Sequence, residues 1–230
     1  MNENKQEKIV SMFNDIAPTY DTANRVLSFG IDKNWRKIAC KKALVINENP
    51  TIIVDVACGT GDMCEYWKKL SKAEVIGIDP AVKMLEVAKN KVKDAQFIEG
   101  EAISLPLEDE SVDILSISYG FRNVIEKEKA LQEFKRVLKP NGLVVILEFT
   151  KLPKNSIVGK IRDTYMKNIL PVVGGFLSKN KEAYQYLPDS IDNFLTKDDL
   201  SSLLQKQGFE IVEIKGHSFE ISTMFIARKI

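Results

Sequence analysis

The stretch TIIVDVACGTGD, residues 51–62, decides the fold. Its first half is short, apolar and β-branched, which predicts a buried strand. Gly59 and Gly61 follow directly, and two glycines let a loop turn tightly and approach a ligand closely. A helical pattern then runs from Gly61 to Leu70. The stretch therefore predicts a strand, a ligand-binding loop and a helix, in that order.

The same alternation continues along the chain. Short apolar runs predict four further strands, and amphipathic patterns predict helices between them. Pro80 stands where a helix should start, and Lys139-Pro140-Asn141-Gly142 should end one. Alternating strands and helices predict a mostly parallel sheet with helices on both faces. The further strands are expected at residues 74–79, 95–99, 112–118 and 142–149, and two of the helices at 81–92 and 126–138.

The carboxyl-terminal end has a different pattern. Residues 209–215 and 219–228 alternate between polar and apolar side chains, which predicts an antiparallel hairpin at the sheet edge. Gly216 and His217 are expected in its exposed turn. The hairpin would bring the sheet to seven strands.

One domain, residues 1–230, is expected from this pattern. Residues 1–48 are mostly helical and are interpreted as a substrate or lid segment. Connections in such folds are normally short, so the insertion at 151–195 is interpreted as a helical cap over the strand ends. The cofactor-binding core is expected at residues 49–150, and the final helix and hairpin at 196–230.

Composition narrows the class of protein. Thirty-three basic residues balance 32 acidic ones, for a net charge of +1, which argues against a nucleic acid partner held by counterion release. Three Cys and one His argue against a disulfide framework and against a metal centre. The sequence has no signal-peptide pattern and no apolar run of about 18 residues. We therefore expect a cytoplasmic globular protein.

The charge of the glycine loop predicts its ligand. A dinucleotide-binding loop needs a third glycine three residues after the second, and position 64 is Cys. Asp55 and Asp62 would repel a pyrophosphate, but they suit a cationic cofactor such as S-adenosylmethionine, a sulfonium with a free ammonium group. We therefore expect Asp55, Gly59 and Gly61 to contribute to an S-adenosylmethionine site. The alternative for Asp55 is that it caps the backbone of the loop.

Two more positions fit the same cofactor. Asp79 ends the second strand, twenty residues after Gly59, where a carboxylate can accept hydrogen bonds from both ribose hydroxyls. Gly100, Glu101 and Ala102 follow the third strand, where an adenine edge could be read.

The end of the fourth strand argues against a nucleic-base nitrogen as the methyl acceptor, because it lacks the motif that many amine methyltransferases have there. Many amine methyltransferases carry an Asp/Asn-Pro-Pro-aromatic motif there, whereas residues 118–124 read SYGFRNV.

The sequence resembles the ubiquinone/menaquinone biosynthesis C-methyltransferases over nearly its whole length. The resemblance is carried by residues 10–21, residues 27–31 with Trp35, and the segments DVACGTGD, GIDPAVKML, GEAISLPLED, SYGFRNV, RVLKPNGLVVILEF and YQYLPDSIDNF.

This resemblance implies a Rossmann-like class I methyltransferase fold. It also implies methyl transfer to a ring carbon of a polyprenylated quinol, either demethylmenaquinol or the analogous ubiquinone precursor 2-methoxy-6-polyprenyl-1,4-benzoquinol. The alternatives are a methyltransferase for another small phenolic or lipid acceptor, a non-catalytic cofactor-binding regulator and a nucleotide-dependent oxidoreductase. By matching motif, the cofactor contacts would be Thr60, Asp79, Glu101, Ala102 and Ser118.

We assign hypothetical catalytic roles to four residues. Arg122 would stabilise the developing phenolate, and Asn123 would hold the ring oxygen. Tyr20 and Asp21 would close over the ring and position or deprotonate its hydroxyl. The alternatives are that Arg122 pairs with an acid to hold its loop, and that Tyr20 is a core aromatic.

A polyprenyl tail would require contact with a membrane surface. Residues 151–182 combine seven basic and two acidic residues with apolar side chains at helical spacing. This segment predicts peripheral association with the inner face of a membrane, with a homodimer interface or an ordinary core-facing helix as alternatives.

Overall fold

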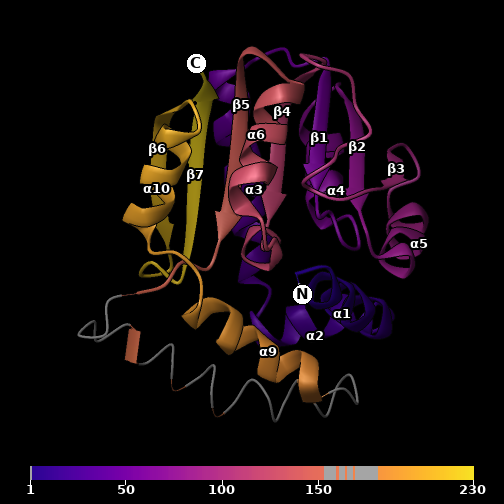
Figure 1. Ribbon diagram of the computed structural model, residues 1–230. Coiled ribbons are helices and arrows are strands. Elements are labelled where there is room, and N and C mark those ends of the chain that lie inside the picture. Colours follow the sequence, from indigo (N-terminus) through magenta and orange to yellow (C-terminus); the bar gives the residue numbers. More distant parts are fainter. Residues whose placement is uncertain (1, 153–158, 161–163, 165–167, 169–180) are drawn as a thin grey trace.

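A seven-stranded sheet forms the centre of the computed structural model, which describes residues 2–152, 159, 160, 164, 168 and 181–230 (Figure 1). The strand order is β3-β2-β1-β4-β5-β7-β6. The first five strands are parallel, and β7 is antiparallel to both β5 and β6. The predicted parallel sheet with a terminal hairpin is confirmed. The strands are β1 (Ile52–Val56), β2 (Glu74–Asp79), β3 (Gln96–Glu99), β4 (Val112–Ser118), β5 (Leu138–Glu148), β6 (Phe209–His217) and β7 (Ser222–Lys229).

Helices cover both faces of the sheet. In β1, Val54 packs into the cluster with α6 (Lys127–Val137) and α10 (Lys197–Lys206), and its neighbour Ile53 packs into the cluster with α3 (Ile31–Ile46) and α4 (Asp62–Leu70). Successive strand side chains point to opposite faces, so a strand buried on both sides is apolar at nearly every position, with Asp55 the exception in β1. This explains why the stretch at residues 51–57 is decisive.

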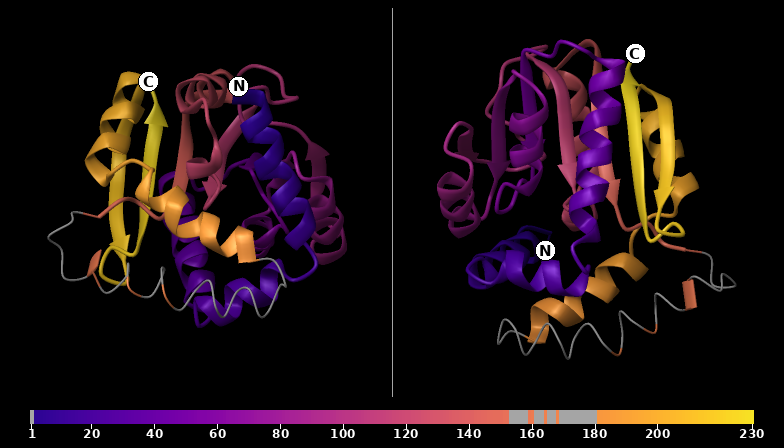
Figure 2. Two further views of the ribbon diagram at one scale, coloured as in Figure 1. Left: turned by 60° about the horizontal axis from the view of Figure 1, so that its bottom comes forward. Right: turned by 180° about the vertical axis from the view of Figure 1, so that it is seen from behind.

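Three helices lie beyond the carboxyl ends of the parallel strands (Figures 1 and 2). They are α1 (Asn2–Ile16), α2 (Tyr20–Leu27) and α9 (Lys181–Asp192), and we call them the lid. A separate apolar cluster joins them to α5 (Val82–Lys91), with Ile16, Leu27, Met84 and Ile191 among its members. Helix α3 packs on the sheet instead, so only α1 and α2 of the predicted segment 1–48 lie over the strand ends.

The hairpin turn differs from its prediction. Gly216 and His217 continue β6, with His217 opposite Ser222 of β7, and His217 is buried at 6% exposure. The turn is made by Ser218, Phe219 and Glu220, which all have positive φ. The prediction of an exposed His217 was wrong because the strand pairing continues through Gly216.

The start of the fifth strand also differs from its prediction. Strand β5 begins at Leu138, four residues before its predicted start, and a shift in its register against β4 accommodates Pro140 and Gly142. A turn signal can be absorbed by a bulge when the neighbouring strand pairs on both sides of it.

The predicted cap is described only in part. Helix α9 and the residues leading to α10 lie within 151–195, whereas most of the basic and apolar segment 151–182 lies outside the described residues. In the part of the chain that the structure describes, no helix is long and apolar enough to cross a membrane.

Candidate active site

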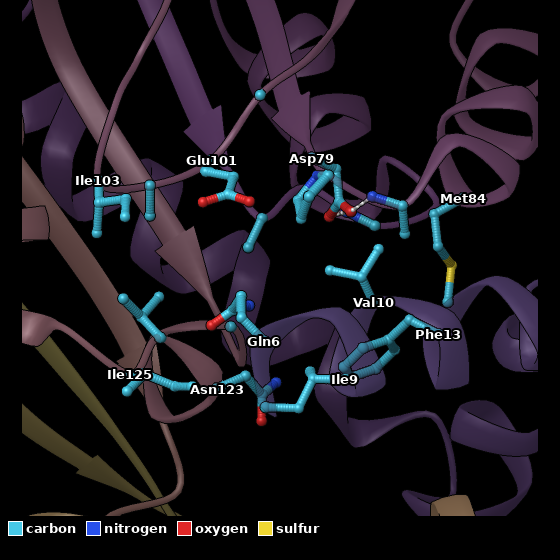
Figure 3. Close-up of a pocket in the computed structure, with 18 of the residues that line it drawn as sticks. Gln6, Ile9, Val10, Phe13, Asp79, Met84, Glu101, Ile103, Asn123 and Ile125 are labelled. Carbon is cyan, nitrogen blue, oxygen red and sulfur yellow. Dashed lines mark hydrogen bonds between the residues drawn. The ribbon is translucent and has the colours of Figure 1, made fainter. Parts of the chain in front are cut away.

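A cavity of about 1160 Å³ lies between the strand ends and the lid (Figure 3). One side carries the carboxylates of Asp79 and Glu101, and the other carries apolar side chains of α1, among them Ile9 and Phe13 (Figure 3). We call the sheet side with Asp79 and Glu101 the polar half, and the part around Ile9, Val10 and Phe13 of α1 the apolar half. Helix α1 also brings four polar side chains to the lining, those of Gln6, Glu7, Ser11 and Asn14. Further lining residues are Ala57, Gly59, Gly100, Ala102, Ile103, Ser118, Tyr119, Asn123, Val124 and Ile125.

The two loop glycines, Gly59 and Gly61, have different roles in the structure. Gly59 has a φ of 54° and lines the cavity, and a Cβ added there would meet no protein atom within 4 Å. Gly61 has a φ of 81°, and a Cβ there would lie 3.1 Å from the Cβ of Ala88 on α5. Gly59 therefore leaves space for a ligand, whereas Gly61 lets α5 pack against the loop.

Asp79 braces the glycine loop while lining the cavity. Its Oδ2 accepts the backbone N–H of Gly59 and its Oδ1 accepts that of Ala81, both at 2.8 Å. Burial raises the pKa of Asp79 to about 6, although these two hydrogen bonds oppose the rise. Each carboxylate oxygen has a further lone pair that a ligand hydroxyl could use.

Ser118 provides a polar group that has no partner in the part of the protein that the structure describes. It ends β4 and lines the cavity, and its Oγ is buried with no hydrogen bond among the described residues. Buried hydroxyls are usually paired, so an orphaned one facing a cavity favours a polar ligand there.

The charge of the cavity is negative. Among its described lining residues five side chains are acidic and one, Lys129, is basic. The acidic residues are Glu7, Asp79, Glu99, Glu101 and Glu126. This lining suits a cation and disfavours a pyrophosphate, which is the property that S-adenosylmethionine requires of its site.

The carboxylates that the sequence analysis selected for this property lie elsewhere. Asp55 is 1% exposed beneath the loop and outside the cavity lining, where its Oδ1 accepts the Ser116 hydroxyl at 2.6 Å. Burial raises the pKa of Asp55 to about 7, and the Ser116 hydrogen bond opposes this rise. Asp55 thus links β1 to its sheet neighbour β4, and among the described residues it accepts no hydrogen bond from the loop backbone, against the alternative that it caps the loop.

Asp62 is neutralised by the protein itself. Its Oδ2 accepts Arg25 Nη2 at 2.5 Å, and its Oδ1 accepts Lys91 Nζ at 2.9 Å. Arg36 Nη1 is 3.9 Å from Oδ2 and also pairs with Asp32. These three cations outweigh the cost of burial and hold the pKa of Asp62 below its ordinary value. Asp62 therefore cannot supply the free negative charge that the sequence analysis attributed to it.

Thr60 and Asp21 are bonded to each other at the edge of the ion-pair cluster that Asp62 forms with Arg25, Arg36 and Lys91. The Thr60 hydroxyl donates to Asp21 Oδ1 at 2.5 Å, and Lys91 pairs with Asp21. Thr60 is 2% exposed, and neither residue lines the cavity. The structure thus brings Asp21 from the lid to the cofactor loop, but it does not place Asp21 against the expected ring position.

Tyr20 does line the cavity. Its ring packs edge-on against Phe13, with centroids 6.1 Å apart. Burial raises the pKa of its phenol, although the positive charge of Arg122 opposes the rise. Tyr20 is therefore protonated near neutral pH and can donate a hydrogen bond, but it is poorly suited to act as a base.

The Arg122 guanidinium makes its hydrogen bonds and its ion pair with other residues of the protein. Its Nη1 is 2.8 Å from Glu148 Oε1 and also donates to the Tyr119 carbonyl, and its Nε donates to Ser190 Oγ at 3.2 Å. The Arg122 side chain is 6% exposed and Glu148 is fully buried. Arg122 does not line the cavity, so this arrangement matches the alternative in which it holds its loop.

Asn123 completes the site. It lies at the end of the short 3₁₀ helix η1 (Phe121–Asn123), is 9% exposed and lines the cavity. Its Oδ1 accepts the hydroxyl of Tyr186 on α9 at 3.0 Å. Sequence reasoning missed Glu148, Tyr186 and Ser190 as parts of this site, although Tyr186 and Ser190 lie within the quoted segment YQYLPDSIDNF.

These features fit S-adenosylmethionine. Asp79 can accept from ribose hydroxyls, Ser118 has an unused hydroxyl, and Glu101 adds negative charge on the same side. The structure brings five of the expected cofactor residues to one cavity: Asp79, Gly59, Glu101, Ala102 and Ser118. The other three, Asp55, Thr60 and Gly61, lie outside the cavity lining.

Comparisons with known proteins agree with this description. The model of the ubiE/COQ5 methyltransferase family matches residues 1–229. A ubiquinone/menaquinone biosynthesis C-methyltransferase from Campylobacter jejuni is 54% identical over 98% of this chain and 99% of its own length. A demethylmenaquinone methyltransferase from Chlorobaculum tepidum is 38% identical over 97% of this chain and 93% of its own.

Solved structures support the fold. A SAM-dependent methyltransferase from Thermotoga maritima covers 95% of this chain and 100% of its own, with a TM-score of 0.64 at 18% identity. Another from Aquifex aeolicus covers 78% of this chain and 82% of its own, with a TM-score of 0.57 at 20% identity.

Proposed function

Because the chain belongs to the ubiE/COQ5 methyltransferase family, we propose that it transfers a methyl group from S-adenosylmethionine to a ring carbon of a polyprenylated quinol. Demethylmenaquinol is the acceptor we favour, since relatives with 38% and 41% identity carry the name demethylmenaquinone methyltransferase. The observation that carries the proposal is the 54% identity to a quinone-biosynthesis C-methyltransferase over almost the whole chain.

The polar half of the cavity would hold the cofactor. Asp79 would accept from the ribose hydroxyls, and Ser118 and Glu101 would bind the polar groups beside it. When bound there, S-adenosylmethionine supplies an electrophilic methyl group on a positively charged sulfur. Gly59 leaves room for the ligand against the loop backbone, as the open space at its Cβ position indicates.

The apolar half would hold the quinol. A quinol carbon becomes nucleophilic when the neighbouring hydroxyl loses its proton, so the residues around the ring must tolerate a developing phenolate. Asn123 and Tyr20 line this part and can donate hydrogen bonds to ring oxygens. Ile9 and Phe13 on α1 exclude water and align the ring with the methyl group, which is the main requirement of the reaction.

Arg122 would support the reaction without touching the quinol ring. Its contacts with Glu148, Ser190 and the Tyr119 carbonyl hold the loop that carries Asn123. Glu148→Gln should then reduce turnover by about as much as Arg122→Ala, although Glu148 lies outside the cavity lining. A turnover loss confined to Arg122→Ala would instead support direct contact with the phenolate.

An isotope-transfer assay tests the reaction. The purified protein, with S-adenosylmethionine labelled in its methyl group, should label reduced demethylmenaquinone and should not label the oxidised quinone. A 2-methoxy-6-polyprenyl-1,4-benzoquinol and a naphthoquinol without a tail complete the acceptor series and report on ring and tail preference. Binding of S-adenosylmethionine without labelling of any quinol would refute the proposal and would favour a non-catalytic regulator.

We also propose contact with an anionic membrane surface. The segment that first suggested it lies mostly outside the described residues, but two aromatic side chains support the idea. Phe29 is 80% exposed at the turn between α2 and α3, and Phe219 is 84% exposed at the hairpin turn. The hairpin turn is bonded to the helix that follows Phe29, because Trp35 of α3 donates its indole N–H to Ser218 Oγ at 3.2 Å.

Sedimentation with vesicles tests this contact. Phe29→Ser with Phe219→Ser, and Lys160→Glu with Lys167→Glu, should each reduce binding to anionic vesicles. Val45→Ser is the matched control, because Val45 is 74% exposed near the carboxyl end of α3. Light scattering of the same variants reports on the predicted homodimer, and loss of dimer without loss of vesicle binding would assign the aromatic residues to a dimer interface.

A further inference from the structure

Helix α9 contacts the site through two side chains on one face. Tyr186 and Ser190 are four residues apart, so they lie one helical turn from each other. Tyr186 binds the side chain of Asn123, and Ser190 binds that of the preceding residue, Arg122. Two neighbouring positions of η1 are therefore held by two neighbouring positions of one lid helix.

From this geometry we infer that Tyr186 is a positioning residue that orients the amide of Asn123 and thereby makes the site competent only when α9 is docked. The inference rests on the proposed function, since it concerns the quinol oxygen that Asn123 would bind. Tyr186 itself does not line the cavity.

The chemistry of an amide makes the orientation consequential. One end of the Asn123 side chain accepts hydrogen bonds and the other donates them. Because the Tyr186 hydroxyl donates to Oδ1, the NH₂ group is the end left for a cavity ligand. A phenolate oxygen is stabilised by a donor and repelled by a carbonyl oxygen, so a reversed amide would oppose the reaction.

The surroundings keep Tyr186 a donor. Burial raises the pKa of its phenol, with Glu148 adding to the rise and Arg122 opposing it. The hydroxyl therefore keeps its proton at neutral pH. Arg122 is already paired with Glu148 and Ser190, so it does not compete for the amide oxygen of Asn123.

The same contact couples the lid to the reaction. Ile191, beside Ser190 on α9, packs with residues of α1 and α2 in the lid cluster. If α9 leaves, Asn123 loses its orienting partner while Asp79, Ser118 and Gly59 keep their places on the sheet. We therefore expect a cofactor that binds with the lid open and a methyl transfer that waits for the lid to close.

Kinetics of four variants test the inference. Tyr186→Phe should lower kcat about tenfold, which is the upper range for one hydrogen bond, and leave the Kd of S-adenosylmethionine unchanged within about twofold. In the Asn123→Ala background the same change should have no further effect. Asn123→Asp should be at least as damaging as Asn123→Ala, because it presents an oxygen to the phenolate. Asp189→Ala, on an exposed position of α9, is the control and should match the parent.

A second readout needs no quinol. Nitrogen-15 NMR of the protein should contain a side-chain NH₂ pair that vanishes in Asn123→Ala, shifts in Tyr186→Phe and stays in Asp189→Ala. Full additivity of Tyr186→Phe and Asn123→Ala, or an NH₂ pair unmoved by Tyr186→Phe, would overturn the inference. Failure of the parent protein to methylate any quinol would instead overturn the proposed function, and the NMR result would still decide the hydrogen bond.

Discussion

The two halves of the cavity are built by different kinds of interaction. On the sheet side, Gly59 and Ala81 are fixed by backbone N–H groups bound to Asp79, and the strands beneath them are paired along their length. On the lid side, α2 and α9 are held by side chains alone: the apolar lid cluster, the ion pairs of Arg25 and Asp21 from α2, and the hydrogen bonds of Tyr186 and Ser190 from α9.

Because of this difference, we expect the sheet side to determine cofactor binding and the lid side to determine when methyl transfer can occur. A site fixed by backbone and sheet pairing is preorganised, so it can take up the cofactor without rearrangement. A site closed by side-chain packing and pairing between helices can open locally, because separating these helices costs less than opening a sheet. The comparison predicts that sheet-side changes alter cofactor affinity, and that lid-side changes alter stability or turnover.

The largest effect is expected from Asp62→Asn. It removes one of the three carboxylates that balance Arg25, Arg36 and Lys91, so that only Asp32 and Asp21 remain for three cations. Breaking a buried ion pair of this kind costs about 3–5 kcal/mol of unfolding free energy. Urea unfolding measures the loss. Asp109→Asn breaks an exposed pair with Arg136 and should cost less than about 1 kcal/mol. Equal losses in the two variants would show that the cluster does not hold the lid.

The pH dependence of this cluster has a definite sign. Because the pKa of Asp62 is lowered in the folded protein, its contribution is present above its unfolded pKa of about 3.9. The contribution is lost only as the pH falls through the lower folded value. The difference in stability between the parent and Asp62→Asn should therefore stay constant from pH 5 to pH 8.

The next effect concerns the sheet side. Asp79→Ala removes the acceptor for two loop N–H groups and for the ribose, so we expect the Kd of S-adenosylmethionine to rise about 100-fold. Calorimetry measures it, with the exposed Asp94→Ala as control. Retention of parent affinity in Asp79→Ala would remove the sheet side from cofactor binding.

A smaller effect follows from the pKa of Asp79, about 6 in the free protein. The deprotonated carboxylate is the form that attracts a cation and accepts hydrogen bonds. Affinity for S-adenosylmethionine should therefore fall about tenfold between pH 7.5 and pH 5, as the group protonates. The slope should flatten in Asp79→Asn, and a slope unchanged by this substitution would assign the titration to another group.

The smallest effect is expected from Tyr20→Phe on the lid side. The phenol donates at most one hydrogen bond to the ring, so turnover should fall only about threefold to tenfold, with cofactor affinity unchanged. Tyr66→Phe, on α4 and outside the cavity lining, is the control. A complete loss of turnover in Tyr20→Phe would mean that this residue removes the hydroxyl proton, against the direction of its pKa shift.

Sequence reasoning succeeded where neighbours in the chain are neighbours in space. Gly59 follows β1 directly, and Asp79 ends the adjacent parallel strand, so strand order alone brings them to one edge. Sequence reasoning failed for Asp62, which has the residue type of a cofactor ligand but lies among Arg25, Arg36 and Lys91 from three other helices.

By itself, the sequence determined the alternation of strands and helices, the glycine loop with Asp79, and the family. These features are local, because hydrophobic period, turn residues and motif spacing all act within a few residues. Only the tertiary structure decided that Glu7, Glu99 and Glu126, rather than Asp55 and Asp62, are among the acids lining the cavity, and that Arg122 binds Glu148. The physical reason is that a side chain's charge and free donors depend on what is packed beside it, and helices distant in the chain supply those neighbours.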